Sequence, residues 1–181
     1  MSNRTGSARV AFCGVMAALA LVFLLLTAVP VTEISLALLA GIALTPVVIE
    51  CGRRYALGAY IAVSLLSLFL VPALEGKVLF IAFFGYYSVL KAWLEEKNLP
   101  RALEWGIKLA VFNAATVIAY WLMLTVFHLD SDSFTIGGVP LPWVFLLLGN
   151  VVFLLYEWCL TRLIARYMVQ WRRYVRRLFR F

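Results

Sequence analysis

The sequence predicts an all-α membrane protein with six transmembrane helices and both termini in the cytoplasm. Three observations lead to this fold class. The chain of 181 residues is 65% hydrophobic, and its mean hydropathy of +0.97 is far above that of soluble domains. The apolar residues form six runs, most of them about 20 residues long, which is enough to cross the hydrocarbon core of a bilayer. The basic residues fall almost entirely on one side of these runs.

The first predicted span covers residues 10–29 and ends before Pro30. Its length favours an uncleaved membrane helix over a signal peptide. Gly14, Ala17 and Ala18 share a face of this helix, and small side chains let another helix approach closely. We take these three residues as partner-facing, while noting that alanine is common in membrane helices generally.

The second to sixth spans follow with short links, so that residues 1–170 form one helical bundle. Pro46 lies inside the second span and should bend it near Thr45, because proline removes a backbone donor. The longest link, residues 129–142, joins the last two spans. The predicted boundaries of the later spans are about 34–51, 55–71, 78–94, 103–128 and 141–168.

The distribution of positive charge predicts the orientation. Of the 16 lysines and arginines, only Lys77 falls on the side opposite to the termini, and Lys108 is counted with the majority. Basic loops stay in the cytoplasm. We therefore expect a protein of the cell membrane with cytoplasmic termini, and with the links after its first, third and fifth spans outside.

The last residues, 171–181, are predicted to form a basic amphipathic helix on the inner membrane surface. Its arginines share one face, and each contributes about 1 kcal/mol beside anionic headgroups. A net charge of +7 would suggest nucleic acid in a soluble protein, but charges at the ends of spans indicate lipid instead. The tail could alternatively dock a cytoplasmic partner. The membrane-surface residues are Arg172, Arg173, Arg176, Arg177 and Arg180.

Counting a rise of about 1.5 Å per residue places the polar side chains of the spans in two layers. The inner layer holds Lys91, Asn113 and Glu157. We predict that Lys91 and Glu157 pair with Asn113 nearby, because either charge alone at that depth costs several kcal/mol. The pair could fix the helix register or serve a transport or proton-relay role. Alternatively, Lys91 could extend to the headgroups without a partner.

The outer layer contains Tyr86, Tyr87, Tyr120 and Asn150. Aromatic walls with a few hydroxyl and amide groups suit a small planar or amphipathic solute, so these are the predicted substrate-binding residues. The alternative is an aromatic belt at the membrane interface, where tyrosine and tryptophan are common.

Motifs for catalysis, nucleotide binding or metal binding do not occur in the sequence. His128 is its one histidine and has no partner at metal-ligand spacing. Cys13, Cys51 and Cys159 are read as small buried apolar side chains without a disulfide. We therefore expect no enzyme activity, no metal and no cofactor.

The layout resembles the substrate-binding S components of energy-coupling-factor (ECF) vitamin transporters. The likeness lies in the length, the six spans, the cytoplasmic termini and the alanine-rich residues 11–20. It implies a vitamin pocket in the outer half, a coupling subunit against Gly14 and Ala17 or Ala18, and two cytoplasmic ATPases that drive release. The link at residues 31–33 is shorter than the lid loop usual in that family, and the string FFGYYSVLK indicates a small membrane family of its own.

Two functional hypotheses follow. The first is a solute-binding subunit of a small-molecule transporter, which needs separate coupling and ATPase subunits because the chain has no ATP motif. The second is a non-transporting scaffold or assembly protein that acts through its basic tail and helix faces. A secondary transporter or channel fits less well, because no internal repeat is visible.

Overall fold

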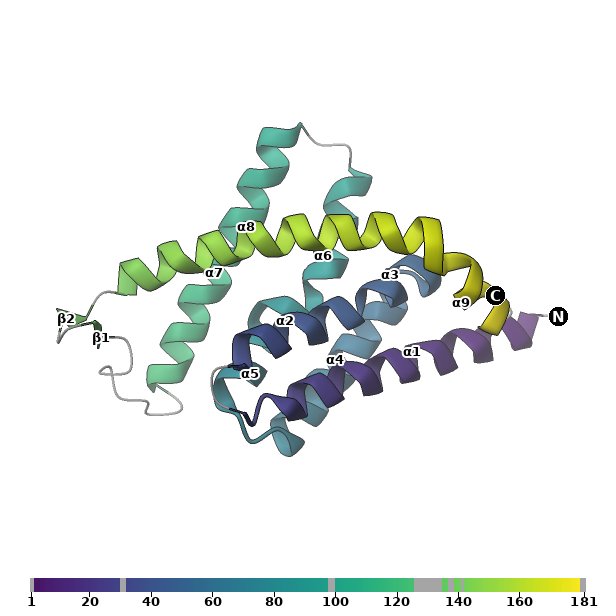
Figure 1. Cartoon of the computed structure of the whole chain (residues 1–181), viewed down its shortest axis with the longest axis horizontal. Helices are drawn as coiled ribbons and strands as arrows, with labels where there is room; N and C mark the ends of the chain where they lie inside the picture. Colours follow the sequence, from purple (N-terminus) through teal and green to yellow (C-terminus); the bar gives the residue numbers. More distant parts are fainter. Residues whose placement is uncertain are drawn as a thin grey trace.

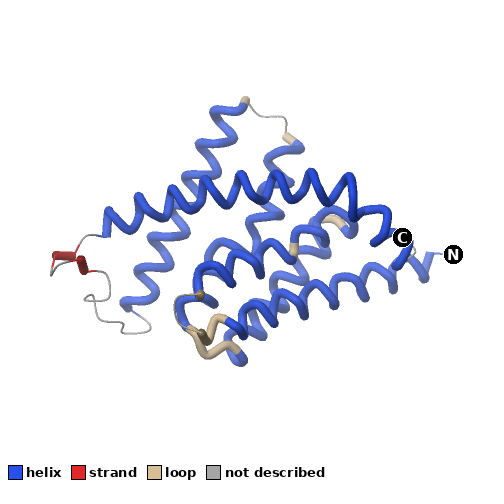
Figure 2. Tube along the Cα trace, viewed as in Figure 1, coloured by secondary structure: helices blue, strands red, loops and turns tan. Residues whose placement is uncertain are grey.

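The computed structural model is built almost entirely from helices (Figure 2). It describes residues 2–29, 32–97, 100–125, 135–136, 139–140 and 142–179. Six helices in this part are long and apolar enough to cross a membrane, which confirms the six predicted helices and indicates a multi-pass membrane protein. These candidate spans are Gly6–Leu26, Glu33–Cys51, Arg53–Leu70, Leu74–Glu96, Arg101–Leu122 and Leu146–Val175.

Several spans are divided into shorter elements. The fourth contains a π-helical segment, η1, and the sixth passes through a second one, η3, into the C-terminal helix. Two short strands pair antiparallel between the last two spans, within a link predicted to be a loop. In chain order the elements are α1 Ser2–Leu26, α2 Glu33–Ala43, α3 Thr45–Cys51, α4 Arg53–Leu70, α5 Leu74–Leu79, η1 Phe80–Phe84, α6 Gly85–Glu96, α7 Arg101–Thr125, β1 Thr135–Ile136, β2 Val139–Pro140, α8 Pro142–Arg166, η3 Tyr167–Trp171 and α9 Arg172–Phe179.

Figure 1 shows that α1 begins and α9 ends at the same end of the bundle, whereas β1 and β2 lie at the other end. An even number of crossings requires this arrangement. Helix α1 packs along α2 and α4, and α7 packs against η1 and α8. Helix α7 crosses α8 steeply instead of running parallel to it (Figure 1).

The second span is broken where the sequence predicts a bend. Leu44 separates α2 from α3, and Pro46 lies in the first turn of α3. A backbone N–H in this turn has no acceptor within its own helix, so proline is tolerated there. This position confirms the predicted bend near Thr45. Gly52 then joins α3 to α4 with a φ of 91°, a left-handed conformation that glycine adopts without strain.

The π-helical segment η1 brings aromatic side chains of the fourth span into the core. A π-helical turn widens the backbone and leaves carbonyl groups less well paired. Here the Tyr60 hydroxyl of α4 donates a hydrogen bond of 2.7 Å to the carbonyl oxygen of Ile81. Phe80, Phe83 and Phe84 are all buried as a result.

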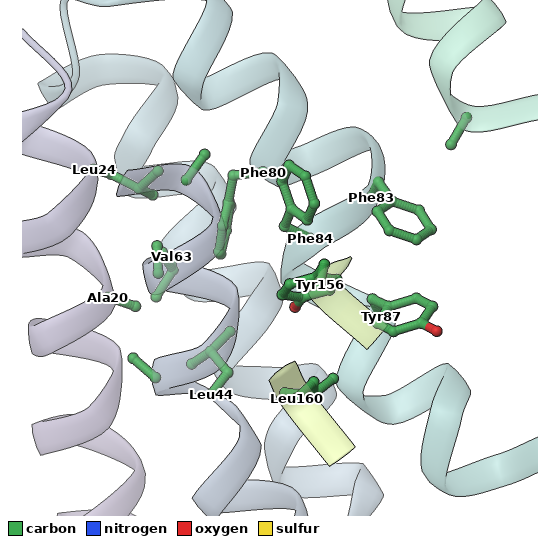
Figure 3. Close-up of a cluster of buried hydrophobic side chains, with 14 of the residues drawn as sticks. Ala20, Leu24, Leu44, Val63, Phe80, Phe83, Phe84, Tyr87, Tyr156 and Leu160 are labelled. Carbon is green, nitrogen blue, oxygen red and sulfur yellow. The ribbon is translucent and has the colours of Figure 1, made fainter. Parts of the chain in front are cut away.

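The core is centred on Phe83. Its ring contacts Phe84, Tyr87, Phe112 and Phe153, mostly edge to face, with centroids 4.7 to 5.6 Å apart. Edge-to-face pairs add to the stabilisation from buried area. Figure 3 shows more of this core, in which Tyr156 of α8 lies beside Phe84, and Leu160 of α8 belongs to the same cluster. This aromatic layer fixes α6, α7 and α8 relative to one another.

Gly41 lies at the close contact between α2 and the end of η1. A Cβ atom added there would lie 2.5 Å from the carbonyl oxygen of Phe84, and a backbone atom cannot rotate away. We expect Gly41→Ala to lower the free energy of unfolding by about 1–3 kcal/mol. The measurement is thermal unfolding of the purified protein in detergent.

Gly58→Ala on α4 is the matched control, because nothing lies within 4 Å of its added Cβ atom. It should be neutral or slightly stabilising, since alanine favours helix more than glycine does. Equal melting temperatures for the two variants would contradict the close packing of α2 on η1.

Candidate functional site

The predicted pair between Lys91 of α6 and Glu157 of α8 is present. The Lys91 Nζ atom lies 2.5 Å from Glu157 Oε1, and each side chain is only 3% exposed. Thr161, one turn further along α8, accepts a second hydrogen bond from Lys91 at 3.0 Å. Lys91 therefore does not extend alone to the headgroups, and the pairing prediction is confirmed.

Two further side chains complete the site around Glu157. Lys108 of α7 is 2% exposed and places its Nζ atom 2.6 Å from the same Oε1 atom. The Tyr87 hydroxyl donates a hydrogen bond of 2.6 Å to the other carboxylate oxygen, Oε2. Both oxygens of Glu157 are thus used, and three different helices supply the groups that meet there.

Each lysine also has a carboxylate on its own helix, four residues away. Lys91 lies 2.9 Å from Glu95 Oε1, and Lys108 lies 2.5 Å from Glu104 Oε1. These outer carboxylates are 49% and 20% exposed, respectively, so the cluster runs from the bundle interior to its surface. If all five groups are ionised, three carboxylates face two ammonium groups, and the formal charge is −1.

The cluster joins α6, α7 and α8 and holds them in one arrangement; we call this the interhelical lock. Buried charges are stable only with well-placed partners, because water is no longer there to solvate them. Among the described residues, Glu157 contacts protein groups of α6, α7 and its own helix. A hydrogen-bonded line from Tyr87 through Glu157 and Lys91 to Glu95 also has the form of a proton path, but tight pairing of each group favours the structural role.

Asn113 does not join this cluster. Its amide pairs reciprocally with that of Asn150, with N···O distances of 3.1 and 2.9 Å. The expectation of Asn113 beside Lys91 and Glu157 is therefore wrong, as is its assignment to a different layer from Asn150. Depth counting assumes helices that run parallel from a common surface, whereas α7 crosses α8 steeply (Figure 1).

The predicted substrate-binding residues have different surroundings in the part of the chain that the structure describes. Tyr86 lines a shallow apolar hollow of about 500 Å³ whose other walls come from α4 and α6. Tyr87 is fully buried against Glu157, and Asn150 is bonded to Asn113. Tyr120 is half-buried on α7 and is not part of that hollow. Their role in binding a solute stays a prediction.

The predicted partner-facing residues lie on a side of α1 that is largely open. Gly14 and Ala18 are exposed, Ala17 is half-buried, and a Cβ atom added at Gly14 would meet nothing within 4 Å. The opposite side of α1, with Phe12, Ala20 and Leu24 fully buried, packs into the bundle.

The C-terminal helix α9 is seated on the bundle. Val175 packs on a buried cluster that includes Phe12 and Val47. Arg172 lies 3.1 Å from Glu50, whose side chain is 1% exposed. Arg172 is therefore drawn partly inward by a buried carboxylate, while contact of the tail arginines with lipid stays a prediction. The side chain of Arg176 and the whole of Arg180 lie outside the described residues.

The cysteines follow the expectation only in part. Cys13 and Cys51 are buried, but Cys159 is exposed on α8, and all three are free thiols. Its position on an outward face of an apolar helix explains the difference, because a small apolar side chain is tolerated there as well as in a core. Among the described residues there is no group of three or more potential ligands that could hold a metal ion.

Sequence reasoning missed Lys108 and Glu104 as members of the cluster. Lys108 was assigned to the charges that set the orientation, yet it is among the largest fully buried side chains. The signal was the spacing from Glu104 to Lys108, four residues apart on one helix face within an apolar segment. Tyr87 was assigned to a ligand pocket because the helix rise predicts its depth in the membrane but not the direction in which its side chain points.

Comparisons of the chain with protein-family models, with curated proteins and with solved structures find no match.

The cluster makes a quantitative prediction for its lysines. Each of Lys91→Met and Lys108→Met leaves Glu157 with one ammonium partner, whereas the double variant leaves a buried carboxylate with none. We expect the double variant to lose about 3–5 kcal/mol of unfolding free energy, which exceeds the sum of the single variants by about 0.5–3 kcal/mol. Urea or thermal unfolding in detergent measures this coupling.

Glu157→Gln should be less harmful than the double variant. Each lysine would keep its partner four residues away, and the remaining four charges would balance. Lys97→Met, at an exposed position at the end of α6, is the control for loss of a lysine. The structural role of the cluster would be contradicted if the losses of unfolding free energy in the two single lysine variants added up to that of the double variant. It would also be contradicted if Glu157→Gln were less stable than the double variant.

Proposed function

We propose that this protein is a non-catalytic membrane subunit that works by docking to a second membrane protein through the outer face of α1. The observation that carries the proposal is the open face of Gly14 and Ala18 on a helix whose other side is firmly packed. Small side chains allow close contact between helices in a bilayer, where apolar area alone gives no preference for protein over lipid.

The orientation that we propose places the end with the termini in the cytoplasm. The basic residues at the start of α4 and in α9 lie at that end, and basic segments stay inside. Helix α9 then rests at the inner surface of the cell membrane, where Arg173 and Arg177 meet anionic headgroups.

The first form of the proposed function is a solute-binding subunit that resembles the S components. The absence of an ATP motif from the sequence and the small-residue face of the first helix both support it. The coupling subunit would contact α1, and cytoplasmic ATPases would drive the cycle. The solute would enter from the end that carries β1 and β2.

The second form is a scaffold or assembly protein without a solute. Two observations favour it. Tyr87 and Asn150, both expected in a ligand pocket, are hydrogen-bonded inside the bundle. In addition, η3 and α9 close the basic end of the bundle and present exposed Trp171 and Tyr174 beside the arginines of α9, which gives a partner both apolar and charged contacts.

Co-purification of the tagged full-length protein from its native membrane tests the proposal. The double variant Gly14→Leu with Ala18→Leu should reduce recovery of membrane partners at least tenfold, because two leucines prevent close helix approach. Recovery of an ATPase pair with the wild-type protein supports the solute-binding form, whereas a partner set without ATPases supports the scaffold form.

Gly58→Leu on α4 is the matched control, since Gly58 is also exposed and has open space beside it. It should leave recovery unchanged. If the α1 variant recovers the same partners as the wild-type protein with unchanged helix content, docking through this face is wrong.

Removal of residues 171–181 separates the roles of the tail. The truncation breaks the Arg172–Glu50 contact and uncovers the cluster beneath Val175, so we expect a lower melting temperature. In the scaffold form, partner recovery should fall as well, even at a temperature where the truncated protein is folded. Unchanged recovery with correct topology would leave the tail as a membrane anchor and count against the scaffold form.

A further inference from the structure

A groove between α4 and α6 opens at the end of the bundle that carries the termini. It has a volume of about 500 Å³. Its walls are mainly large apolar side chains, with one cation at the mouth. The lining residues are Arg53, Leu57, Tyr86, Val89, Leu90 and Trp93.

The groove is a shallow apolar hollow that follows α6 along the surface of the bundle. Leu57 and Trp93 form exposed rims, and Val89 is buried at the floor. Tyr86 lines the part of the groove farthest along α6 from Trp93, and its ring packs edge-on against Tyr60 with centroids 5.9 Å apart. From Trp93 to Tyr86 the groove follows α6 for seven residues, or about 10 Å of helix.

The mouth of the groove is positively charged. Arg53 pairs with Glu96 at 3.0 Å, and both side chains are well exposed, so this pair is weak and leaves the guanidinium accessible. Lys97 lies 3.8 Å from the centroid of the Trp93 ring. Among the described residues, no carboxylate forms a salt bridge with Arg54 or Lys97. Glu95, which is 49% exposed, pairs with Lys91 at 2.9 Å.

We propose that this groove is a specific site for one anionic phospholipid, with an acyl chain between α4 and α6 and the phosphate beside Arg53 and Lys97. Apolar walls and a cationic mouth match the two parts of such a lipid. Tryptophan at the mouth suits the headgroup level of the membrane. A partner helix is the poorer occupant, because helix docking in membranes favours small residues and these walls are large.

Competition between lipids tests the site on the full-length protein. Native mass spectrometry is carried out after equilibration in detergent with equal amounts of phosphatidylglycerol and phosphatidylcholine. We expect one retained phosphatidylglycerol per chain, favoured at least fivefold over phosphatidylcholine. The double variant Arg53→Gln with Lys97→Gln should lose this preference, whereas Lys77→Gln, at the other end of the bundle, should keep it.

A second measurement locates the acyl chain. Phosphatidylglycerol with brominated acyl chains should quench Trp93 more strongly than brominated phosphatidylcholine does, as read from the difference between the wild-type protein and Trp93→Phe. Leu57→Phe should fill the groove and reduce this quenching at least twofold. Leu65→Phe, exposed further along α4, should not.

Three outcomes would overturn the proposal. These are equal retention of the two lipids by the wild-type protein, unchanged preference in the Arg53 and Lys97 double variant, and Trp93 quenching that does not depend on the headgroup. If the double variant instead loses a co-purifying membrane protein while lipid retention is unchanged, the groove is a protein-docking site. Circular dichroism checks that each variant keeps its helix content.

Discussion

Glu157 is the group on which the positions of the last three spans depend. Its carboxylate accepts hydrogen bonds from two ammonium groups and a phenol hydroxyl. Because this site is buried, water cannot replace any of these donors. In a bilayer, apolar side chains do not by themselves select one helix neighbour over another, because lipid tails are equally apolar. Directional contacts from Lys91 and Lys108 therefore specify the register, and the aromatic rings around Phe83 fill the space that this register leaves.

The sequence allowed the six helices, the break at Pro46 and the pairing of Lys91 with Glu157 to be predicted, because each follows from one-dimensional rules. Length and hydropathy define a span, proline interrupts a helix, and an isolated buried charge requires a partner. The other members of the cluster depend on helix crossing and rotation, which no spacing rule supplies. Asn113 was misplaced because α7 crosses α8 steeply, and Tyr87 because π-helical residues precede it and rotate its direction.

Several polar groups of the bundle interior are paired with one another, whereas some of those at the end that carries the termini remain accessible. Inside, Glu157 is satisfied by Tyr87, Lys91 and Lys108, and the two asparagines are satisfied by each other. At the end that carries the termini, Arg172 holds α9 against Glu50, while Arg53 and Lys97 line the mouth of an apolar groove. Together with the open face of α1, these features place the surfaces that we propose for recognition on the periphery of the bundle.

The charges of the cluster also bear on how the chain is synthesised and inserted. Lys91 and Lys108 leave the ribosome before Glu157, so the fourth and fifth spans must meet the membrane while the carboxylate of α8 is still missing. Each lysine has a glutamate four residues away on its own helix, which can neutralise it during that interval. When α8 arrives, Glu157 joins the two neutral pairs into the interhelical lock. The last span thus completes the assembly of the earlier ones.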